Sequence, residues 1–173
     1  QSLEELPRSP PFTPIIRDLE FLDREGHRIE SVAAGDGLAV RVHYRSQRPI
    51  RDAYFGITLE TAEGVKLCWL QTRVQRGRIG DLPPAGTLLC SIPSLPLVPG
   101  SYYVTVGCGS QTTPLDFVER CCRLEVVVSD FFGTGRMPNS KQAAVLVKAD
   151  WQFEPDKEHV RRDEIQSIVP QLT

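Results

Sequence analysis

The sequence predicts an all-β fold in which two antiparallel sheets pack face to face as a sandwich. From residue 15 onward, short runs of alternating apolar and polar residues follow one another, and Gly, Pro and Asp residues separate them. A period of two is typical of strands that bury one face, and short strands at this spacing are typical of β-sandwiches. The helical period of 3.6 residues is nearly absent. We therefore expect one domain with its core between two sheets.

Nine runs account for the expected strands, and turn residues mark most of the breaks between them. Glycine-containing turns are expected at residues 24–26, 35–37, 62–64 and 99–100. One short helical turn is expected at residues 114–119, just before a strand. The expected strands are residues 15–22, 28–33, 38–45, 53–60, 65–72, 86–92, 101–108, 121–129 and 144–153.

The phase of the alternation indicates which side chains face the core. In residues 38–45 the even positions are apolar, and the same is true of 101–108 and 121–129, whereas in 53–60 the odd positions are apolar. Trp69 falls on the apolar phase of its run, which favours a core position. Cys121 and Cys122 are adjacent in a strand-like run and should point to opposite faces. The outward set that offers hydrogen-bonding or aromatic groups is Arg41, His43, Tyr54, Thr58, Tyr103, Thr105 and Arg123.

The two ends of the chain differ from its strand-rich middle. Residues 1–14 hold four prolines among charged residues, which predicts a linker from a preceding domain. Residues 15–153 form the expected sandwich domain. Residues 154–173 form a charged tail, either a short helix or disordered.

Composition excludes several classes of protein. The chain is 40% hydrophobic and 24% charged with a net charge of −2, and no apolar run reaches the length of a membrane span. The weak negative charge disfavours nucleic acid as a partner. The five cysteines lack C-x-x-C spacing, and no export signal is visible, so we expect reduced thiols in the cytoplasm and no metal or cofactor.

Motifs for catalysis are missing, whereas the residue types for sugar binding are present. The sequence has no phosphate-binding P-loop, no G-x-S-x-G elbow and no dinucleotide-binding glycine motif, so we expect no enzyme activity from this chain. Aromatic rings stack on the apolar faces of pyranoses, and Arg or Thr side chains bond their hydroxyls. The outward set therefore forms the candidate carbohydrate-binding site. Exposed tyrosines and charges are also ordinary on strands, so this residue set is permissive rather than diagnostic.

Two stretches resemble a known family. The segment YFGITLE at residues 54–60, followed by GVKL at 64–67, resembles the hairpin of the C-terminal carbohydrate-binding domain in Wzt-type ATP-binding subunits of O-antigen ABC exporters. The segment IPSLPLVPGSYYVTV at residues 92–106 is similar to the same family's signature. The GDGL turn at residues 35–38 and the closing run that ends near Trp151 fit as well, so the resemblance covers about residues 15–153.

This resemblance implies an immunoglobulin-like sandwich that dimerises by exchanging its C-terminal strand, residues 144–153. It also implies recognition of a finished O-antigen-type polysaccharide at the cytoplasmic face of the inner membrane. The partners would be the glycan, a second copy and, through the full-length ATPase subunit, the transmembrane subunit. Two alternatives stay open: a structural or protein-interaction adaptor of the same fold, and a glycan-modifying enzyme.

Overall fold

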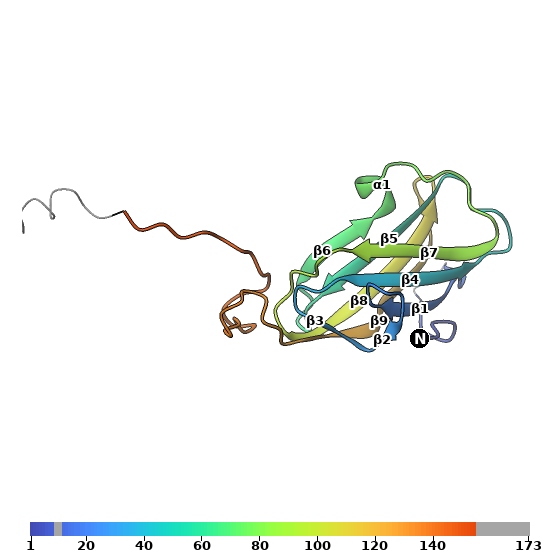
Figure 1. The fold of residues 1–173 in the computed structure, drawn as a ribbon. Coiled ribbons are helices and arrows are strands. Elements are labelled where there is room, and N and C mark those ends of the chain that lie inside the picture. The colour runs from blue at the N-terminus through green and yellow to red at the C-terminus, as the bar shows by residue number, and fades with distance from the viewer. Residues whose placement is uncertain (9–11, 155–173) are drawn as a thin grey trace, which may run out of the picture.

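A computed structural model describes residues 1–8 and 12–154 as two facing sheets with almost no helix (Figure 1). The four-stranded sheet has the order β2-β1-β4-β7 and the five-stranded sheet the order β3-β9-β8-β5-β6. Among the described residues, no helix is long and apolar enough to span a membrane. The elements are β1 (Ile16–Leu22), β2 (Arg28–Ile29), β3 (Ser31–Ala33), β4 (Leu38–Arg45), β5 (Ala53–Glu60), β6 (Lys66–Gln71), α1 (Thr72–Gln75), β7 (Ala85–Ile92), β8 (Gly100–Ser110) and β9 (Thr113–Val127).

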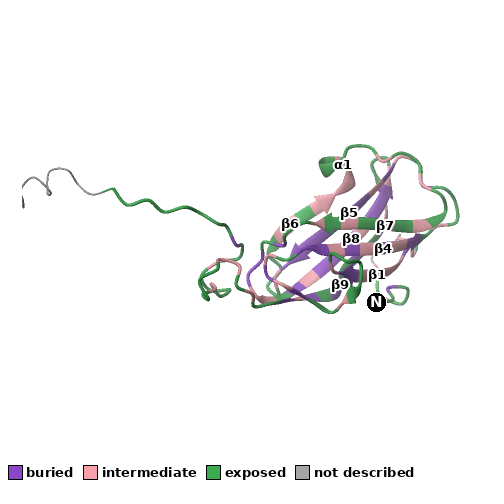
Figure 2. Cartoon of the chain, viewed as in Figure 1, coloured by how far each residue is buried: buried purple, intermediate pink, exposed green. Residues whose placement is uncertain are grey.

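The core lies between the sheets and follows the predicted alternation. In β4 the even residues, Leu38 to Tyr44, are buried, and in β5 the buried residues include Phe55, Ile57 and Leu59. The ring centroids of Tyr44 and Phe55 lie 5.4 Å apart, so aromatic packing joins the two sheets directly. Figure 2 shows that many of the buried residues lie on central strands such as β5 and β8. The expected sandwich is confirmed.

The run at residues 28–33 is two strands rather than the single one predicted. Ile29 in β2 pairs with Phe21 of β1, whereas Val32 in β3 pairs in parallel with Val126 of β9 in the other sheet. Ile29 and Val32 are three residues apart, and both pack on the core. A straight strand would place them on opposite faces, so the chain changes sheets at Glu30.

The predicted helical turn at residues 114–119 is wrong, because this segment belongs to β9. It forms a long hairpin with β8, whose turn contains Gln111 at a φ of 55°. A β-bulge interrupts the hairpin, and Arg120 at the bulge has a φ of 46°. Three residues of β9, 119–121, lie opposite Thr105 alone, so the phase is the same on both sides of the bulge, with Val118 and Cys122 both buried. Within the bulge Cys121 is buried as well, and its sulfur lies 3.9 Å from that of Cys122, so the two side chains do not point to opposite faces as predicted.

The run at residues 144–153 is not a strand within the described chain. Val145 makes an isolated bridge with Leu97, and Leu146 is buried beside it. The chain then leaves the sandwich in an extended form (Figure 1), and Trp151 and Phe153 are 95% and 90% exposed. A strand needs a neighbouring edge to satisfy its backbone groups, and beyond Leu146 the described residues supply none. Whether a second copy supplies one stays a prediction.

Part of the predicted linker packs against the sandwich. Ser2 bridges to Asp18 of β1, and the Leu3 amide donates to the Arg17 carbonyl at 2.8 Å. The Leu3 side chain is fully buried in the core. Residues 1–8 therefore add a short layer beside β1.

Candidate functional site

The seven predicted site residues separate onto two opposite outer surfaces. Arg41 and His43 project from β4 on the outer side of the four-stranded sheet. The other five lie on the five-stranded sheet, whose inner face packs on the same core. A core layer about 10 Å thick separates two such sheets, so the seven cannot form one site. The residues of the second group are Tyr54, Thr58, Tyr103, Thr105 and Arg123.

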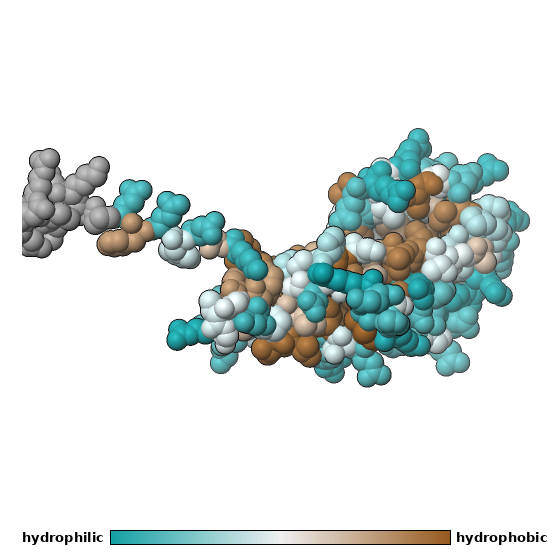
Figure 3. Space-filling view, in the orientation of Figure 1, coloured by the Kyte–Doolittle hydropathy of each residue, from teal (hydrophilic) through white to brown (hydrophobic). Residues whose placement is uncertain are grey.

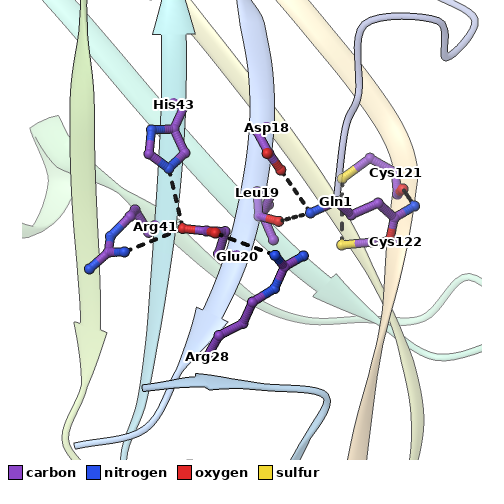
Figure 4. A network of polar contacts seen from close by, with 9 residues as sticks. All are labelled: Gln1, Asp18, Leu19, Glu20, Arg28, Arg41, His43, Cys121 and Cys122. Carbon is purple, nitrogen blue, oxygen red and sulfur yellow. Dashed lines mark hydrogen bonds and ion pairs between the residues drawn. The ribbon is translucent and has the colours of Figure 1, made fainter. Parts of the chain in front are cut away.

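On the four-stranded sheet, the predicted residues are engaged by one carboxylate (Figure 4). Arg41 donates to Glu20 Oε2 at 3.3 Å, and His43 Nε2 lies 3.3 Å from the same oxygen. Arg28 lies 3.6 Å from Oε1, and Thr87 Oγ1 lies 3.0 Å from His43 Nδ1. The hydrogen bond with His43, together with Arg41 and Arg28, holds the pKa of Glu20 below its ordinary value. This network links side chains of β1, β2, β4 and β7, so it stabilises the four-stranded sheet.

On the five-stranded sheet, the strand register places glycines in the middle of the outer surface. Gly56 on β5 is the direct partner of Gly107 on β8 and of Gln71 on β6. Gly107 is in turn the partner of Phe117 on β9, and Tyr54 is the partner of Gly109. Direct partners in antiparallel strands share one face, so these residues form neighbouring rows.

Three aromatic rings lean over these glycines. A Cβ on Gly109 would lie 2.2 Å from Tyr54, one on Gly107 would lie 2.8 Å from Phe117, and one on Gly56 would lie 3.3 Å from Trp69 Nε1. A Cβ at Gly107 or Gly109 would overlap the neighbouring ring, whereas a Cβ at Gly56 would only crowd Trp69. Trp69 is 58% exposed and Phe117 is 40% exposed. We call this surface, formed by Tyr54, Trp69 and Phe117 over the three glycines, the aromatic face.

Trp69 therefore corrects the sequence prediction of a core position. The pairing of β5 with β6 shifts at Glu60, where a β-bulge places Leu59 opposite Cys68 but Glu60 opposite Lys66. Leu67, Cys68 and Leu70 consequently pack toward the core, and Trp69 turns outward beside Thr58. Sequence reasoning missed both Trp69 and Phe117. The sequence does contain a signal for these two rings, namely glycines at outward-facing positions of the central strands.

Thr58 and Thr105 form the floor of this surface rather than exposed ligand contacts. They are direct partners across β5 and β8, and both point away from the core. Both are nevertheless buried, and the Thr105 hydroxyl accepts a hydrogen bond from the Arg120 amide at 2.9 Å. They point away from the core as predicted but are not exposed, and contact of either one with a glycan stays a prediction.

Arg120, at the bulge in β9, organises the polar end of the aromatic face. Its guanidinium carbon lies 3.9 Å from the centroid of the Tyr103 ring, and its Nε lies 3.1 Å from Glu60 Oε1. The same side chain donates to the carbonyls of Thr61 and Ala62. One ring face of Tyr103 is thus occupied by a cation. Arg120 was absent from the predicted set because alternation alone gives no sign of a bulge.

Arg123 is exposed at the edge of the same surface and pairs with its neighbours. Its guanidinium donates to Glu125 at 2.6 Å and to the Ser101 hydroxyl at 3.0 Å. Arg73 approaches Tyr54 in a similar way, with its guanidinium carbon 4.9 Å from the ring centroid. The surface therefore combines exposed aromatic rings with charged groups at both ends. Such a surface suits a flat ligand with apolar faces and hydroxyl edges.

Groups for other chemistry are sparse in the part of the chain that the structure describes. One trio could hold a metal ion: Asp23, Glu25 and His27, whose ligand atoms lie within 4.8 Å of one another. These residues occupy the exposed turn between β1 and β2, where Asp23 already bonds the His27 amide at 2.8 Å. The five cysteines are free thiols. The trio by itself gives no metal site.

Two facing sheets with a continuous core define the chain as an immunoglobulin-like β-sandwich domain. The chain belongs to the Wzt C-terminal domain family, whose family model matches residues 15–137. It is 26% identical over 154 residues to the O-antigen export system ATP-binding protein RfbB of Myxococcus xanthus, covering 88% of this chain. The chain spans only 34% of the length of that relative.

A solved structure described as the C-terminal domain of Wzt shares the fold. It superposes with a TM-score of 0.62 at 16% identity, covering 89% of this chain and all of the other. At this identity the likeness concerns the fold alone. The family expected from residues 54–67 and 92–106 is confirmed.

The Glu20 network makes a pH-dependent contribution to stability. A carboxyl group whose pKa is lower in the folded chain stabilises the fold above the ordinary Glu pKa of about 4.3, and this contribution is lost as the pH falls through the folded pKa. At pH 7 we expect Glu20→Gln to lower the free energy of unfolding by up to about 1 kcal/mol, since Arg41 and His43 are partly exposed.

Urea unfolding at pH 7 and near pH 3 measures this difference, which should shrink toward zero at the lower pH. Glu30→Gln, at an exposed position just after β2, is the matched control and should leave stability unchanged at both pH values. A difference for Glu20→Gln that persists unchanged at low pH would show that the carboxylate charge is not responsible.

Proposed function

We propose that this chain is the non-catalytic polysaccharide-binding domain of an O-antigen-type ABC exporter, and that the aromatic face is its glycan contact. The strongest support is that aromatic side chains pack directly over glycines of the five-stranded sheet, and that two of them, Trp69 and Phe117, are exposed. The sheet keeps these rings in place as a surface on which a ligand can stack. Family membership and the RfbB relative support the transport context. The glycan would be a finished O-antigen-type polysaccharide.

The geometry explains how such a surface would bind a sugar chain. A pyranose that stacks on Trp69 or Phe117 removes apolar area of both partners from water. Arg120 and Arg123 lie at the other end of the same sheet surface, where their guanidinium groups would donate to hydroxyl groups and the exposed Glu125 beside Arg123 would accept from them. Binding on an open surface buries little area, so we expect affinity in the micromolar to millimolar range.

The wider setting follows from the same proposal. The full-length protein would be an ATP-binding subunit in the cytoplasm at the inner face of the inner membrane, and it would dock on the exporter's transmembrane subunit. This chain would select cargo and leave hydrolysis to the ATPase domain. An adaptor role without glycan binding is the outcome if the titrations below detect no sugar.

Removing a ring from the aromatic face should weaken glycan binding. We expect Trp69→Ala and Phe117→Ala each to raise the Kd for the O-polysaccharide of the source organism about tenfold, which corresponds to about 1.4 kcal/mol. Isothermal titration measures this. Leu89→Ala is the matched control, since Leu89 is 57% exposed on the four-stranded sheet, and it should bind like the unchanged chain. Equal affinity in all three variants would refute this placement of the site.

We also propose that residues 144–153 pair with a second copy of the chain. Val145, Val147, Trp151 and Phe153 are exposed and share one phase of an alternating run. Figure 3 shows hydrophilic and apolar residues alternating along this extended segment. The outermost strands β6 and β7 offer open edges, and a cavity of about 190 Å³ lies between them, lined by core residues such as Phe55 and Leu88. An exchanged strand would satisfy both the edge and the exposed apolar side chains.

A truncated chain distinguishes loss of the exchanged strand, which gives a folded monomer, from unfolding of the domain. A chain ending at Lys148 keeps the buried Leu146 but lacks Trp151 and Phe153, and we expect it to be monomeric and folded. A chain ending at Glu154 is the control and should remain dimeric. Light scattering after size exclusion gives the mass of each. A dimer that survives truncation at Lys148 would rule out the exchange.

A further inference from the structure

A buried ion pair joins the N-terminal segment to the strand that carries Phe117. Arg8 Nε donates to Asp116 Oδ1 at 2.8 Å, although the two residues are 108 positions apart. The side chains of Arg8 and Asp116 are only 4% and 0% exposed. Charges this deeply buried are tolerated only when paired and hydrogen-bonded, so the contact has a defined geometry.

Both partners of this pair are saturated with further hydrogen bonds. Asp116 Oδ2 accepts from the amides of Ile15 and Ile16 at 2.7 and 2.8 Å. The Arg8 guanidinium also donates to the carbonyls of Leu3 and Leu6 at 2.9 and 3.0 Å, and to that of Ile16 at 2.8 Å. One ion pair therefore holds three pieces of backbone: the N-terminal segment, the entry to β1 and the start of β9.

The position of Asp116 in β9 connects this pair to the aromatic face. Asp116 pairs with Cys108 of β8 and points to the buried side, while the next residue, Phe117, pairs with Gly107 and points to the outer side. The Phe117 ring rests against Gly107, where a Cβ would lie 2.8 Å away. A shift of the backbone at Asp116 is thus transmitted to Phe117 through a single peptide unit.

We propose that the Arg8–Asp116 pair is a positioning device that clamps residues 1–8 to the sandwich and fixes Phe117 in the aromatic face. Residues 1–8 would then be fixed to the sandwich and would not move independently of it. Anything that pulls on this segment would act on β9 and so on the candidate binding surface. Its effect on glycan affinity rests on the proposed function, whereas the clamp and the placement of Phe117 do not.

Asp116→Asn tests the clamp, since it keeps the size of the side chain but leaves Arg8 without its counter-charge. We expect amide hydrogen exchange in residues 2–8 and at Ile15 and Ile16 to become at least tenfold faster. The ring resonances of Phe117 should shift, and the Kd for the O-polysaccharide should rise several-fold. Arg17→Ala, which breaks the exposed Arg17–Glu4 pair in the same region, is the control and should change none of these.

A double variant separates positioning from stability. Arg8→Met with Asp116→Asn leaves no unpaired charge, so it should recover part of the stability lost in the single variant. Exchange in residues 2–8 should nevertheless stay fast and the Phe117 resonances should stay shifted. If Asp116→Asn does not fold, Arg8→Lys, which keeps the charge but not the donor pattern, gives the same readouts at smaller amplitude.

Two results would overturn the proposal. Unchanged exchange in residues 2–8 would show that the pair does not clamp the segment, and unchanged Phe117 resonances would show that it does not position the ring. If the unchanged chain binds no glycan, the proposed function fails. Exchange and the Phe117 resonances would still decide the clamp.

Discussion

The register between β5 and β8 is the constraint on which the rest of the structure depends. These strands lie side by side within the five-stranded sheet and pair residue by residue from Ala53 with Ser110 to Glu60 with Tyr103. This pairing points Phe55 and Val106 into the core and sets Gly56 against Gly107 on the outside. A slip by one residue would bury the glycines and expose the core residues. The hydrophobic effect that fixes the core therefore also fixes the aromatic face.

The alternation of apolar residues was enough to predict the sandwich and most of its strands. It gave the correct phase for β4, β5 and β8, and it placed Tyr54 and Tyr103 on an outer surface. Alternation reports inside or outside but not which sheet a strand joins. Arg41 and His43 were therefore grouped with residues that lie on the opposite side of the molecule. Sheet membership depends on long-range pairing, which a local pattern does not contain.

Two further errors, at Trp69 and at Cys121, arise from β-bulges. A bulge that adds one residue to a strand reverses the phase beyond it, and in β6 this turned Trp69 outward. The bulge in β9 adds two residues and leaves the phase unchanged, but it buries Cys121 beside Cys122. The predicted strand at residues 144–153 is absent for a different reason, because apart from the isolated bridge of Val145 to Leu97 no described strand pairs with it. The outward glycines were present in the sequence, and close approach of a side chain is what such glycines indicate.

The central claim is that the aromatic face, whose rings pack over glycines, forms the glycan contact. A glycan titration followed residue by residue with nuclear magnetic resonance tests this claim most directly. With the source organism's O-polysaccharide, we predict shifts of the Trp69 indole, the Phe117 ring and the amides of Gly56 and Gly107. The indole of Trp151, outside the aromatic face, serves as an internal reference. Shifts confined to Arg41, His43 and their neighbours on the four-stranded sheet, or no shifts at all, would contradict the account.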